Sequence, residues 1–475
     1  MVGRERERDV MLQCLDSSQS ELIAILGRRR VGKTFLIRNV YSKNMAFEIT
    51  GIQNGTKREQ FQNFSNQLVA YFNLNPKTKR PTSWLGAFAL LSSCMEQSKS
   101  KNKKVIFFDE LPWIAETSKT KFIEALGHFW NNWAVKNKVV IVICGSAASW
   151  IVKHIINAKG GLYNRVTKKI FLKPFTLYET NKFLIKKNIF VDEHSTLQLY
   201  MALGGIPHYL NQMESNKSIA ENLTEICFNN TGLLHNEFDN LYEALFLNHE
   251  QYVEIIKALA NSKKGLSRQE IIQSSGIPDG GTLTQMLKDL VQCDFILEQN
   301  PFNQKKRFTV YRLIDEFSLF YLRFIQGKNT TTKNYWTRTM ATSEYKIWAG
   351  YAFENICFRH QHQIILATKL EAIQTEFSSF YHSATKELPG AQIDMVLDRA
   401  DQVINLFEIK FYKEPLIITK DMAQNLRTKM AIFRAATKTK SQIFISLVSV
   451  YGIVDNQYSN GLLAHNIGAA DLFMK

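Results

Sequence analysis

A short glycine-rich segment near the N-terminus has the residue types and spacing of a phosphate-binding loop. It reads Gly27-Arg28-Arg29-Arg30-Val31-Gly32-Lys33-Thr34 and fits the pattern G-x-x-x-x-G-K-[ST]. The glycines allow backbone N–H groups to turn inward on a phosphate, which a Cβ would hinder. The lysine brings positive charge to the β- and γ-phosphates, and the threonine hydroxyl is a ligand for Mg²⁺. The loop therefore predicts binding of a nucleoside triphosphate with Mg²⁺.

The sequence on either side of this loop supports the same prediction. Leu22–Leu26 is fully apolar, as expected of a buried parallel strand. Phe35–Val40 continues as a helix, whose N-terminus favours an anion. The alternative is a glycine turn that only joins a strand to a helix.

Two acids directly follow a second apolar run, Val105–Phe108. In a phosphate-loop enzyme, such acids are needed at the end of the neighbouring strand. Asp109 would hold Mg²⁺ through its water shell, and Glu110 would polarise the attacking water. The alternative is that both acids only terminate the strand and cap the next helix.

Two further polar residues follow in the chain. Ser146 comes directly after a third buried strand, Val139–Cys144. It would lie at the carboxyl edge of the sheet, where ligands bind in open α/β folds, and could contact the γ-phosphate or the lytic water. Arg165 follows Gly160-Gly161 in a loop and is a candidate arginine finger, although an ordinary surface arginine fits the same pattern.

Composition limits the class of protein that can carry these residues. The 475 residues are 45% hydrophobic and 21% charged, which predicts two to four globular domains. The net charge of +16 favours a polyanionic partner, with nucleic acid ahead of an acidic membrane surface. The six cysteines are widely spaced without a C-x-x-C pair, so we expect reduced, mostly buried thiols and no zinc site.

Neither the N-terminus nor any apolar run indicates a membrane protein. The first eight residues are charged and lack the apolar core of a signal peptide. The longest apolar stretch, Val139–Val152, is interrupted by Gly145-Ser146 and is too short to span a bilayer. We expect a soluble, cytoplasmic protein without a membrane partner.

Seven segments in the first two thirds of the chain carry a family resemblance. They are Val2–Glu5, Gly27–Thr34, Phe107–Glu110, Cys144–Ser146, Tyr163–Arg165, Leu172–Phe175 and Gly204–Pro207. In this order they resemble the archaeal-type ATPases, a branch of the STAND class within the AAA+ fold. The resemblance implies that Gly3 and Arg4 border the adenine and that Pro207 packs on the base or ribose. Without the family context, Gly204–Pro207 is a plain turn between helices.

The next segment has the pattern of a winged helix. Helices are expected at Glu250–Ala260, Arg268–Ser274 and Thr282–Cys293, and wing strands at Phe295–Leu297 and Phe308–Tyr311, with Lys305-Lys306-Arg307 at the tip. The third helix could enter a major groove through Thr282–Lys288. In related ATPases such a module is usually an internal lid that holds the resting state, and both roles are compatible.

The C-terminal part resembles the PD-(D/E)XK nuclease fold. A helix containing Glu354 precedes the strand that carries Asp394 and the strand that ends in Glu408 and Lys410. The resemblance implies that Asp394 and Glu408 bind Mg²⁺ or Mn²⁺, with Glu354 as an accessory ligand. Lys410 projects to the same face and could orient water. The alternative is a salt bridge at the strand edges, because E-x-K is a weak pattern that Glu344–Lys346 also fits.

A basic helix is expected after these strands, from about Thr419 to Ala436. Its region carries a surplus of Lys and Arg that suits a phosphate backbone, although a solvated helix face remains an alternative. The residues are Lys410, Lys413, Lys420, Arg427, Lys429, Arg434, Lys438 and Lys440, against Glu414 and Asp421.

The predicted fold is α/β: an AAA+ P-loop parallel sheet with a helical lid, a winged-helix domain and a C-terminal restriction-endonuclease-like α/β domain. The expected segments are the ATPase domain at 1–175, the lid at 176–247, the winged helix at 248–326, a linker at 327–342 and the nuclease-like domain at 343–475.

This organisation predicts an ATP-binding and hydrolysing switch coupled to a metal-dependent DNA nuclease. ATP and Mg²⁺ are the expected cofactors, with Mn²⁺ possible at the nuclease-like site. DNA is the expected partner, and oligomerisation is compatible with the sequence. In the main alternative, the C-terminal domain only binds DNA or protein and ATP sets its exposure. A third reading is a sequence-specific regulator that uses the winged helix.

Overall fold

The computed structural model describes the whole chain except residues 76–79, 98–101, 116–120, 247, 305–307 and 331–333. The predicted wing tip, Lys305-Lys306-Arg307, therefore lies outside the described residues. The chain divides into two units. The first comprises Met1–Lys173 with Gln285–Asp294, and the second comprises Pro174–Thr284 with Phe295–Lys475.

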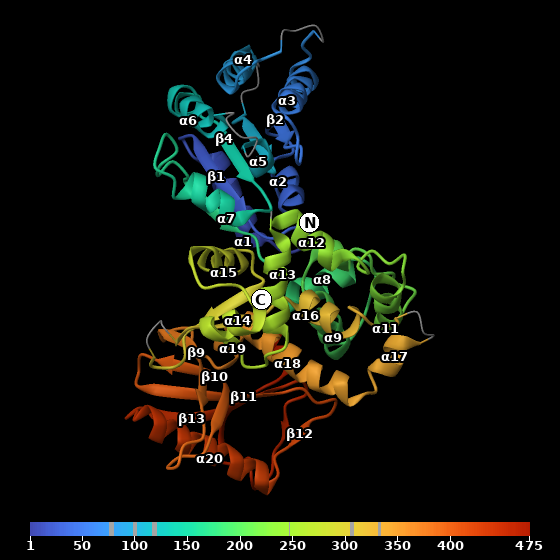
Figure 1. Cartoon of the computed structure of the whole chain (residues 1–475), viewed down its shortest axis with the longest axis vertical. Coiled ribbons are helices and arrows are strands. Elements are labelled where there is room, and N and C mark those ends of the chain that lie inside the picture. The colour runs from blue at the N-terminus through green and yellow to red at the C-terminus, as the bar shows by residue number, and fades with distance from the viewer. Residues whose placement is uncertain (76–79, 98–101, 116–120, 247, 305–307, 331–333) are drawn as a thin grey trace. The chain divides into compact units, whose positions relative to one another are not determined.

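A five-stranded parallel sheet is the centre of the first unit (Figure 1, blue to teal). Its strands are β1 (Glu21–Leu26), β2 (Met45–Thr50), β3 (Val105–Asp109), β4 (Val140–Cys144) and β5 (Lys168–Phe171). All residues of β3 and β4 are buried, which explains why these strands read as continuous apolar runs.

The order of this sheet is β2-β3-β4-β1-β5. The sequence predicted that β3, which is followed by the two acids, would neighbour the phosphate-loop strand β1. The structure shows that it does not. Instead β4 lies between β3 and β1 and pairs with both. Because all the strands are parallel, their carboxyl ends still lie at one edge of the sheet.

The helices of the first unit follow the strands in α/β alternation. They are α1 (Glu5–Asp16), α2 (Lys33–Tyr41), α3 (Lys57–Phe72), α4 (Trp84–Gln97), α5 (Leu111–Ala115), α6 (Phe122–Asn132) and α7 (Ala148–Ile151), with a 3₁₀ turn at Ala134–Lys136 and a π-helical turn at Val152–Ile156. Aromatic side chains join α3, α4 and α6 to the sheet. The Phe88 ring stacks on Phe129 at 4.9 Å and meets Phe108 of β3 edge-on at 5.9 Å.

The second unit begins with helices. They are α8 (Leu177–Lys186), α9 (Glu193–Leu203), α10 (Pro207–Leu210), α11 (Ile219–Leu223), a π-helical turn (Thr224–Phe228) and α12 (Glu237–Leu245). Both α8 and α11 begin with a capping box, in which a Thr or Ser side chain and a Glu three residues later satisfy each other's backbone N–H groups.

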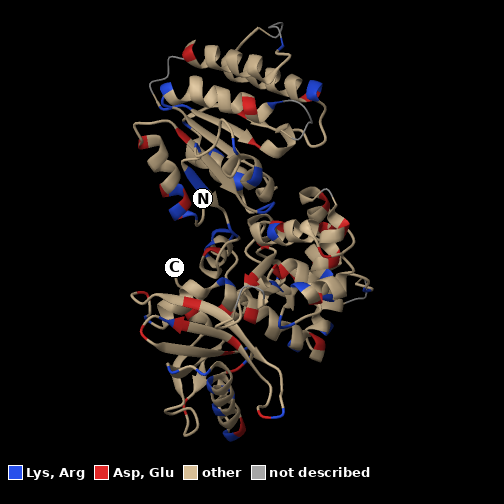
Figure 2. Ribbon diagram, turned by 60° about the vertical axis from the view of Figure 1, so that its left-hand side comes forward, with Lys and Arg blue, Asp and Glu red and all other residues tan. Residues whose placement is uncertain are grey.

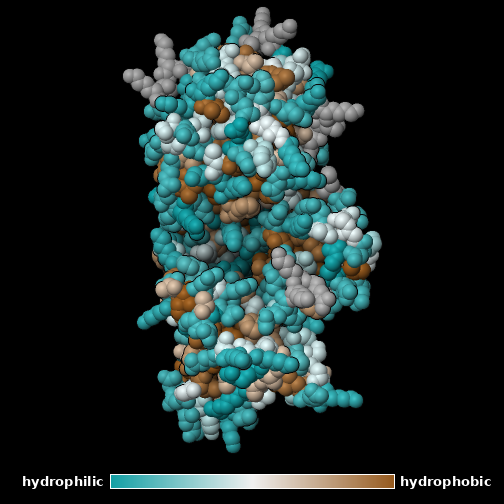
Figure 3. Space-filling model, turned by 90° about the vertical axis from the view of Figure 1, so that its left-hand side faces the viewer, coloured by the Kyte–Doolittle hydropathy of each residue, from teal (hydrophilic) through white to brown (hydrophobic). Residues whose placement is uncertain are grey.

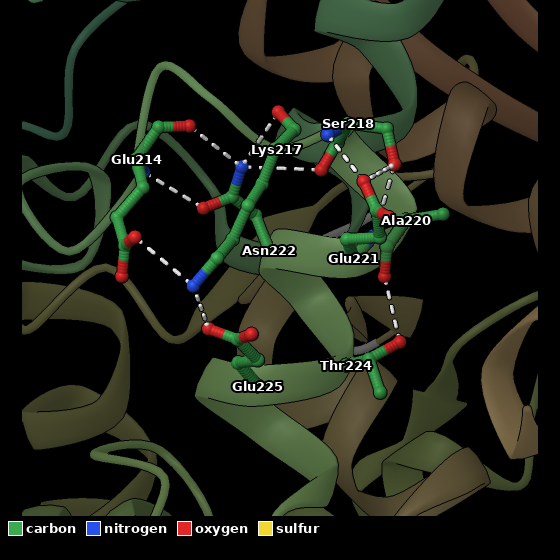
Figure 4. Close-up of polar contacts among 8 residues, drawn as sticks. All are labelled: Glu214, Lys217, Ser218, Ala220, Glu221, Asn222, Thr224 and Glu225. Atoms are coloured by element: carbon green, nitrogen blue, oxygen red, sulfur yellow. Dashed lines mark hydrogen bonds and ion pairs between the residues drawn. The ribbon is translucent and has the colours of Figure 1, made fainter. Parts of the chain in front are cut away.

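A buried asparagine fixes the turn that leads into α11 (Figure 4). The Asn222 side chain accepts a hydrogen bond from the Glu214 N–H at 2.8 Å. Its amide donates to the carbonyls of Glu214, Lys217 and Ser218 at 3.0–3.1 Å. One side chain therefore satisfies backbone groups of Glu214 and Lys217 that the helix ladder does not reach, whereas the Ser218 carbonyl also accepts the Asn222 backbone N–H at 3.0 Å.

A three-helix and three-strand module follows. It contains α13 (His249–Ala260), β6 (Leu266–Ser267), α14 (Arg268–Ser275), α15 (Gly281–Gln292), β7 (Ile296–Gln299) and β8 (Val310–Leu313). The three strands form an antiparallel sheet in the order β6-β8-β7. These elements lie where the sequence predicted the helices and the wing strands. Residues of α15 contribute to both units.

Residues 327–342, predicted as a linker, contain a helix and a buried tryptophan. The helix is α17 (Tyr335–Thr339), which follows α16 (Glu316–Phe324). Trp336 is 2% exposed, and its ring lies 5.2–5.4 Å from the rings of Phe320 and Phe324 of α16. Trp336 is thus packed against α16, whereas most other described residues of this segment are exposed, and its role as a linker stays a prediction.

The C-terminal part forms a mixed sheet in the order β15-β13-β11-β10-β9 (Figure 1, orange to red). Its elements are α18 (Ser343–Arg359), α19 (Gln361–Ala367), β9 (Thr375–His382), β10 (Ala391–Arg399), β11 (Val403–Lys410), β12 (Leu416–Ile417), α20 (Lys420–Thr437), β13 (Gln442–Ser449), β14 (Ile453–Val454), β15 (Leu463–Ile467) and α21 (Ala469–Leu472). β9, β10 and β11 pair antiparallel, whereas β11, β13 and β15 are parallel. Phe433 of α20 packs in one core with Val396 and Leu406 of the sheet.

The surface is mostly hydrophilic with separate hydrophobic patches on the face that Figure 3 shows. Among the described residues, no helix combines the length and the hydropathy needed to cross a bilayer. All six cysteines are buried and free, which confirms the expected buried thiols.

The Asn222 contacts generate the first prediction. Asn222→Ala should lower the free energy of unfolding by about 1–3 kcal/mol, because it leaves buried backbone groups of the turn unsatisfied. Glu225→Ala serves as the control, because it removes only one of the two carboxylates that contact the Lys217 ammonium in the same turn. Urea unfolding followed by circular dichroism measures both variants. Equal losses in the two variants would show that the turn does not depend on Asn222.

Candidate functional site

The phosphate-binding loop connects β1 to α2. Gly27 has φ +145°, and a Cβ there would lie 2.3 Å from the carbonyl oxygen of Leu172. Gly32 has φ +92° and directly precedes the first turn of α2. Both fixed glycines are therefore required by backbone geometry, and one of them also by close packing against the segment after β5.

Lys33 is buried at the start of α2 and points back into the loop. Its ammonium donates to the carbonyl oxygens of Gly27 at 2.8 Å and Arg28 at 3.0 Å. These oxygens hold the cation over the loop in the place where a phosphate-loop lysine meets the β- and γ-phosphates. Of the other loop residues, Arg28 and Val31 are buried, whereas Arg29 and Arg30 are half-buried.

Asp109 is buried at the end of β3 and is oriented by three donors. The Thr34 hydroxyl donates to its Oδ2 at 2.8 Å, which brings together the two predicted Mg²⁺ ligands. The backbone N–H of Glu110 and the Cys144 thiol both donate to its Oδ1 at 3.0 Å. A hydroxyl and a carboxylate in contact beside a phosphate loop are a donor set that fits Mg²⁺.

Cys144 was expected only to be a buried thiol, and its contact with Asp109 has no sequence signal. It ends β4, the strand inserted between β1 and β3. Burial, reinforced by the Asp109 carboxylate, raises the pKa of this thiol well above its ordinary value. It is therefore a neutral hydrogen-bond donor that holds Asp109 from the side opposite Thr34.

Glu110 and Ser146 meet each other across the same sheet edge. The Ser146 backbone N–H and hydroxyl both donate to Oε2 of Glu110, at 2.9 and 3.0 Å. Glu110 has φ +43°, a conformation that non-glycine residues seldom adopt and that often occurs at functional sites. The two residues that sequence reasoning assigned to water and to the γ-phosphate are thus joined in this structure.

The N-terminal segment lies against the phosphate loop. Gly3 and Arg4 both have positive φ, at 61° and 64°, so the chain turns sharply before α1. Arg4 is buried, and its guanidinium donates to the Val31 carbonyl at 3.4 Å. The expected contact of Gly3 and Arg4 with the adenine stays a prediction.

Two other predicted residues lie in later segments of the chain. The Arg165 side chain is exposed in a turn before β5. Pro207 opens α10 in the second unit. Their roles as arginine finger and base contact stay predictions.

A second polar cluster lies in the C-terminal sheet. In the antiparallel pair of β10 and β11, Met395 is opposite Phe407, so Asp394 and Glu408 lie next to this register point. Asp394 accepts a hydrogen bond from the Ile409 N–H at 2.8 Å. Glu408 Oε1 accepts from the Lys410 ammonium at 2.7 Å, and Oε2 accepts from Lys429 of α20 at 2.7 Å.

The electrostatics of this cluster show that its members interact. Burial, and then the Glu354 and Glu408 carboxylates, raise the pKa of Asp394 to about 7. Burial also disfavours ionisation of Glu408, but Lys410 and Lys429 outweigh it and hold the Glu408 pKa below its ordinary value. Burial opposes the charge of Lys410, yet Glu408 and Asp394 raise its pKa. The structure therefore brings together the four residues that the sequence singled out.

Two basic residues complete this cluster. Arg312 of β8 is 4% exposed and forms an ion pair with Glu354 at 2.7 Å, while its Nε donates to Asn355 at 2.6 Å. Its guanidinium also lies 4.5 Å from the centre of the Tyr351 ring. Sequence reasoning missed Arg312, because nothing in strand β8 indicates a partner on α18. Lys429 was counted only as part of the basic helix.

The predicted metal ligands are not assembled as a metal-binding set. In the part of the chain that the structure describes, no three His, Cys, Asp or Glu side chains are arranged to hold a metal ion. The reason is visible in the contacts, since Lys410 and Lys429 occupy both oxygens of Glu408 and Arg312 pairs with Glu354. The Asp394 carboxylate lies close to Glu354, Glu408 and Lys410.

Comparison with known proteins identifies the first site. Residues 1–213 match the family described as "ATPase domain predominantly from Archaea". The chain is 24% identical over 415 residues to an uncharacterized protein of Methanocaldococcus jannaschii, covering 86% of this chain and 87% of that protein.

Among solved structures, a Walker-type ATPase of Pyrococcus abyssi shares 20% identity with a TM-score of 0.51, covering 68% of this chain and 96% of that one. The ORC2 protein of Aeropyrum pernix, solved as ADPNP and ADP complexes, shares 13% identity with a TM-score of 0.45 and covers 72% and 96%. Residues 1–213 thus match an ATPase domain of archaeal type, and the parallel sheet with its phosphate loop is consistent with a P-loop ATPase.

Lys33→Ala should abolish ATP binding, because the loop loses the ammonium that meets the β- and γ-phosphates. Lys43→Ala is the matched control, since Lys43 is exposed just after α2. Isothermal calorimetry with ATP and Mg²⁺ measures both variants. If Lys33→Ala bound ATP with the affinity of the wild type, the loop would not be the phosphate-binding site.

Glu110→Gln should keep ATP binding but slow hydrolysis by about 10²–10⁴-fold, because the amide keeps the shape but loses the charge that polarises water. Phosphate release at saturating ATP gives the rate, and calorimetry gives the affinity. If the variant hydrolyses ATP at the wild-type rate, Glu110 does not activate water and is only the residue that follows β3.

Proposed function

We propose that this protein is an ATP-dependent switch of the STAND type within the AAA+ fold, coupled to a metal-dependent DNA nuclease formed by its C-terminal sheet. The ATPase domain supports the first half of the proposal. The observation that carries the second half is the convergence of Asp394, Glu408 and Lys410 on the neighbouring inner strands β10 and β11 of a mixed sheet.

In the ATPase half, the residues of the chain divide the work on the nucleotide. Lys33 binds the phosphates, and Thr34 with Asp109 would hold Mg²⁺, which supplies charge neutralisation when bound. Glu110 orients water. In this arrangement the Ser146 N–H and hydroxyl donate to the Glu110 carboxylate. These hydrogen bonds must break before Ser146 can contact a γ-phosphate.

The order of elements supports a nuclease-like fold for the second half. α18 is followed by the antiparallel strands β9, β10 and β11, then by α20 and the parallel strand β13. This order supports the proposed likeness to the PD-(D/E)XK fold, with Glu354 on α18, Asp394 on β10 and Glu408 with Lys410 on β11.

A divalent cation could use Asp394 and Glu408 once the Lys410 and Lys429 ammonium groups leave the oxygens of Glu408. Two neighbouring carboxylates repel each other, and the raised pKa of Asp394 reports that repulsion together with burial. Mg²⁺ or Mn²⁺, when bound, would supply a Lewis acid for phosphodiester hydrolysis. Lys410 would orient water or neutralise a phosphate oxygen, and Glu354 would be an accessory ligand once separated from Arg312.

DNA is the proposed substrate because the charge around this sheet is complementary to a phosphate backbone. On α20, Lys420, Arg427 and Arg434 are exposed (Figure 2, with Lys and Arg in blue). The whole chain carries a net charge of +16. We also propose that the module of α13 to β8 is a winged helix, which serves as a lid and provides further DNA contacts.

The alternative is an ATP-gated regulator whose C-terminal domain binds DNA or protein without cleavage. One observation favours it: both oxygens of Glu408 are paired with lysines, as in a structural ion-pair network. The two functions differ in whether removal of these carboxylates abolishes a metal-dependent reaction.

Asp394→Ala, Glu408→Ala and Lys410→Ala should each abolish Mg²⁺- or Mn²⁺-dependent DNA cleavage while ATP hydrolysis persists, because the ATPase residues lie in another unit. Glu344→Ala is the control: it belongs to the other E-x-K match and lies on the first turn of α18, where it pairs with Arg323. Plasmid and single-stranded DNA are incubated with either metal, with and without ATP. If wild type cleaves neither form under any condition, the regulator is the better account.

A further inference from the structure

We propose that a cavity beside the nuclease-like cluster binds unpaired nucleotides, so that the substrate is DNA with a single-stranded region. This inference rests on the proposed nuclease function and narrows its substrate class. The cavity has a volume of about 750 Å³, and its wall includes Lys263, Lys346, Tyr351, Glu354, Lys410 and Tyr412. All of these residues belong to the second unit.

The cavity is continuous with the polar cluster described above. Glu354 and Lys410 belong to both, and Tyr351 in its wall stacks on Arg312, which pairs with Glu354. A nucleotide seated here would therefore have its backbone next to Asp394 and Glu408. The cavity is placed to hold the part of a strand that flanks the phosphodiester to be cleaved.

The wall offers apolar surface that a base can cover. Tyr412, Ile347 and Ile417 line the cavity and are 48%, 51% and 60% exposed. Exposed apolar side chains that line one cavity together, rather than singly, are a feature of ligand-binding grooves. A nucleobase has a flat π-face that stacks on tyrosine irrespective of its sequence.

The rim supplies charge of the opposite sign to a DNA backbone. Lys263, Lys346 and Lys413 are exposed and line the cavity together with Lys410. Two glutamates, Glu354 and Glu414, are also present, and Glu354 is already paired with Arg312. Lys410 is paired with Glu408, so the other three lysines face Glu414 and leave a positive balance around an apolar centre, which is the combination found in single-strand binding grooves.

An intact duplex cannot use such a cavity, because stacking with neighbouring base pairs hides both faces of each base. An unpaired base can enter it, and the volume lies within the range of about 300–1,000 Å³ typical of small-ligand pockets. The cavity therefore favours single strands, overhangs or flaps over blunt duplex.

The test measures binding by the full-length protein without divalent metal, using fluorescence anisotropy. The probes are a labelled single-stranded oligonucleotide, the blunt duplex of the same sequence, and that duplex with a single-stranded overhang. We expect the single strand and the overhang to bind more tightly than the blunt duplex. Tyr412→Ala should weaken the single-strand complex by about 5- to 150-fold, whereas Tyr412→Phe should retain it.

Phe190→Ala is the matched control, because Phe190 is 74% exposed and does not line the cavity. Thermal unfolding followed by circular dichroism verifies that each variant is folded. Equal binding of single strand and blunt duplex, or an unchanged affinity in Tyr412→Ala, would overturn the proposal. The proposal would also be overturned if Phe190→Ala weakened single-strand binding as much as Tyr412→Ala does.

Failure of the nuclease proposal has a different signature. Cleavage by Asp394→Ala and single-strand binding by Tyr412→Ala are therefore measured separately, because Tyr412 lines the cavity and Asp394 does not. If wild type cleaves no DNA and Tyr412 still controls single-strand affinity, the cavity stands and the nuclease assignment falls. If cleavage depends on Asp394 while Tyr412→Ala binds normally, the nuclease assignment stands and the cavity proposal is wrong.

Discussion

The charge of a buried carboxylate must be balanced by hydrogen bonds or by opposite charges. Both polar clusters of the chain are arranged to meet this requirement. Removing an ion from water costs several kcal/mol unless hydrogen bonds or opposite charges replace its solvation. In the first unit, Asp109 receives three hydrogen bonds, from Thr34, Glu110 and Cys144. Each donor comes from the carboxyl end of a strand or the helix that follows it. The order of the sheet is therefore what makes this acid tolerable at a buried position.

The second cluster is compensated by cations. Lys410 and Lys429 neutralise Glu408, and Arg312 neutralises Glu354. Asp394 has the least compensation, receiving a single backbone hydrogen bond, and its pKa is raised. Because Arg312 comes from β8, the three-strand module contributes directly to the charge balance of the C-terminal sheet. Movement of that module would therefore change the environment of the proposed catalytic carboxylates.

The sequence predicted the local chemistry of the phosphate loop better than it predicted the order of the strands in the sheet. The phosphate loop and its strand and helix were predictable, because the two glycines, the lysine and the apolar run each have one dominant physical use. The position of β4 between β1 and β3 was not, since strand order depends on long-range pairing that local patterns do not record. The packing of Trp336 was missed for a similar reason, because a segment rich in Thr, Asn and Lys reads as a linker.

Contacts between distant residues were also beyond the sequence. Arg312 and Glu354 are 42 positions apart, and Cys144 and Asp109 are 35 apart. Neither pair belongs to a motif with fixed spacing. By contrast, Glu408 and Lys410 could be paired in advance, because residues two apart on a strand project to the same face. The winged-helix role of the module and the activity of the nuclease-like sheet remain predictions that rest on these contacts.

The central claim is that nucleotide at the first site controls chemistry at the second. The direct measurement compares DNA cleavage by wild type and Lys33→Ala across ATP concentrations, at fixed Mn²⁺ and with a single-stranded substrate. The account predicts that ATP changes the wild-type cleavage rate and leaves the rate of Lys33→Ala constant. Identical responses of the two proteins to ATP would contradict it.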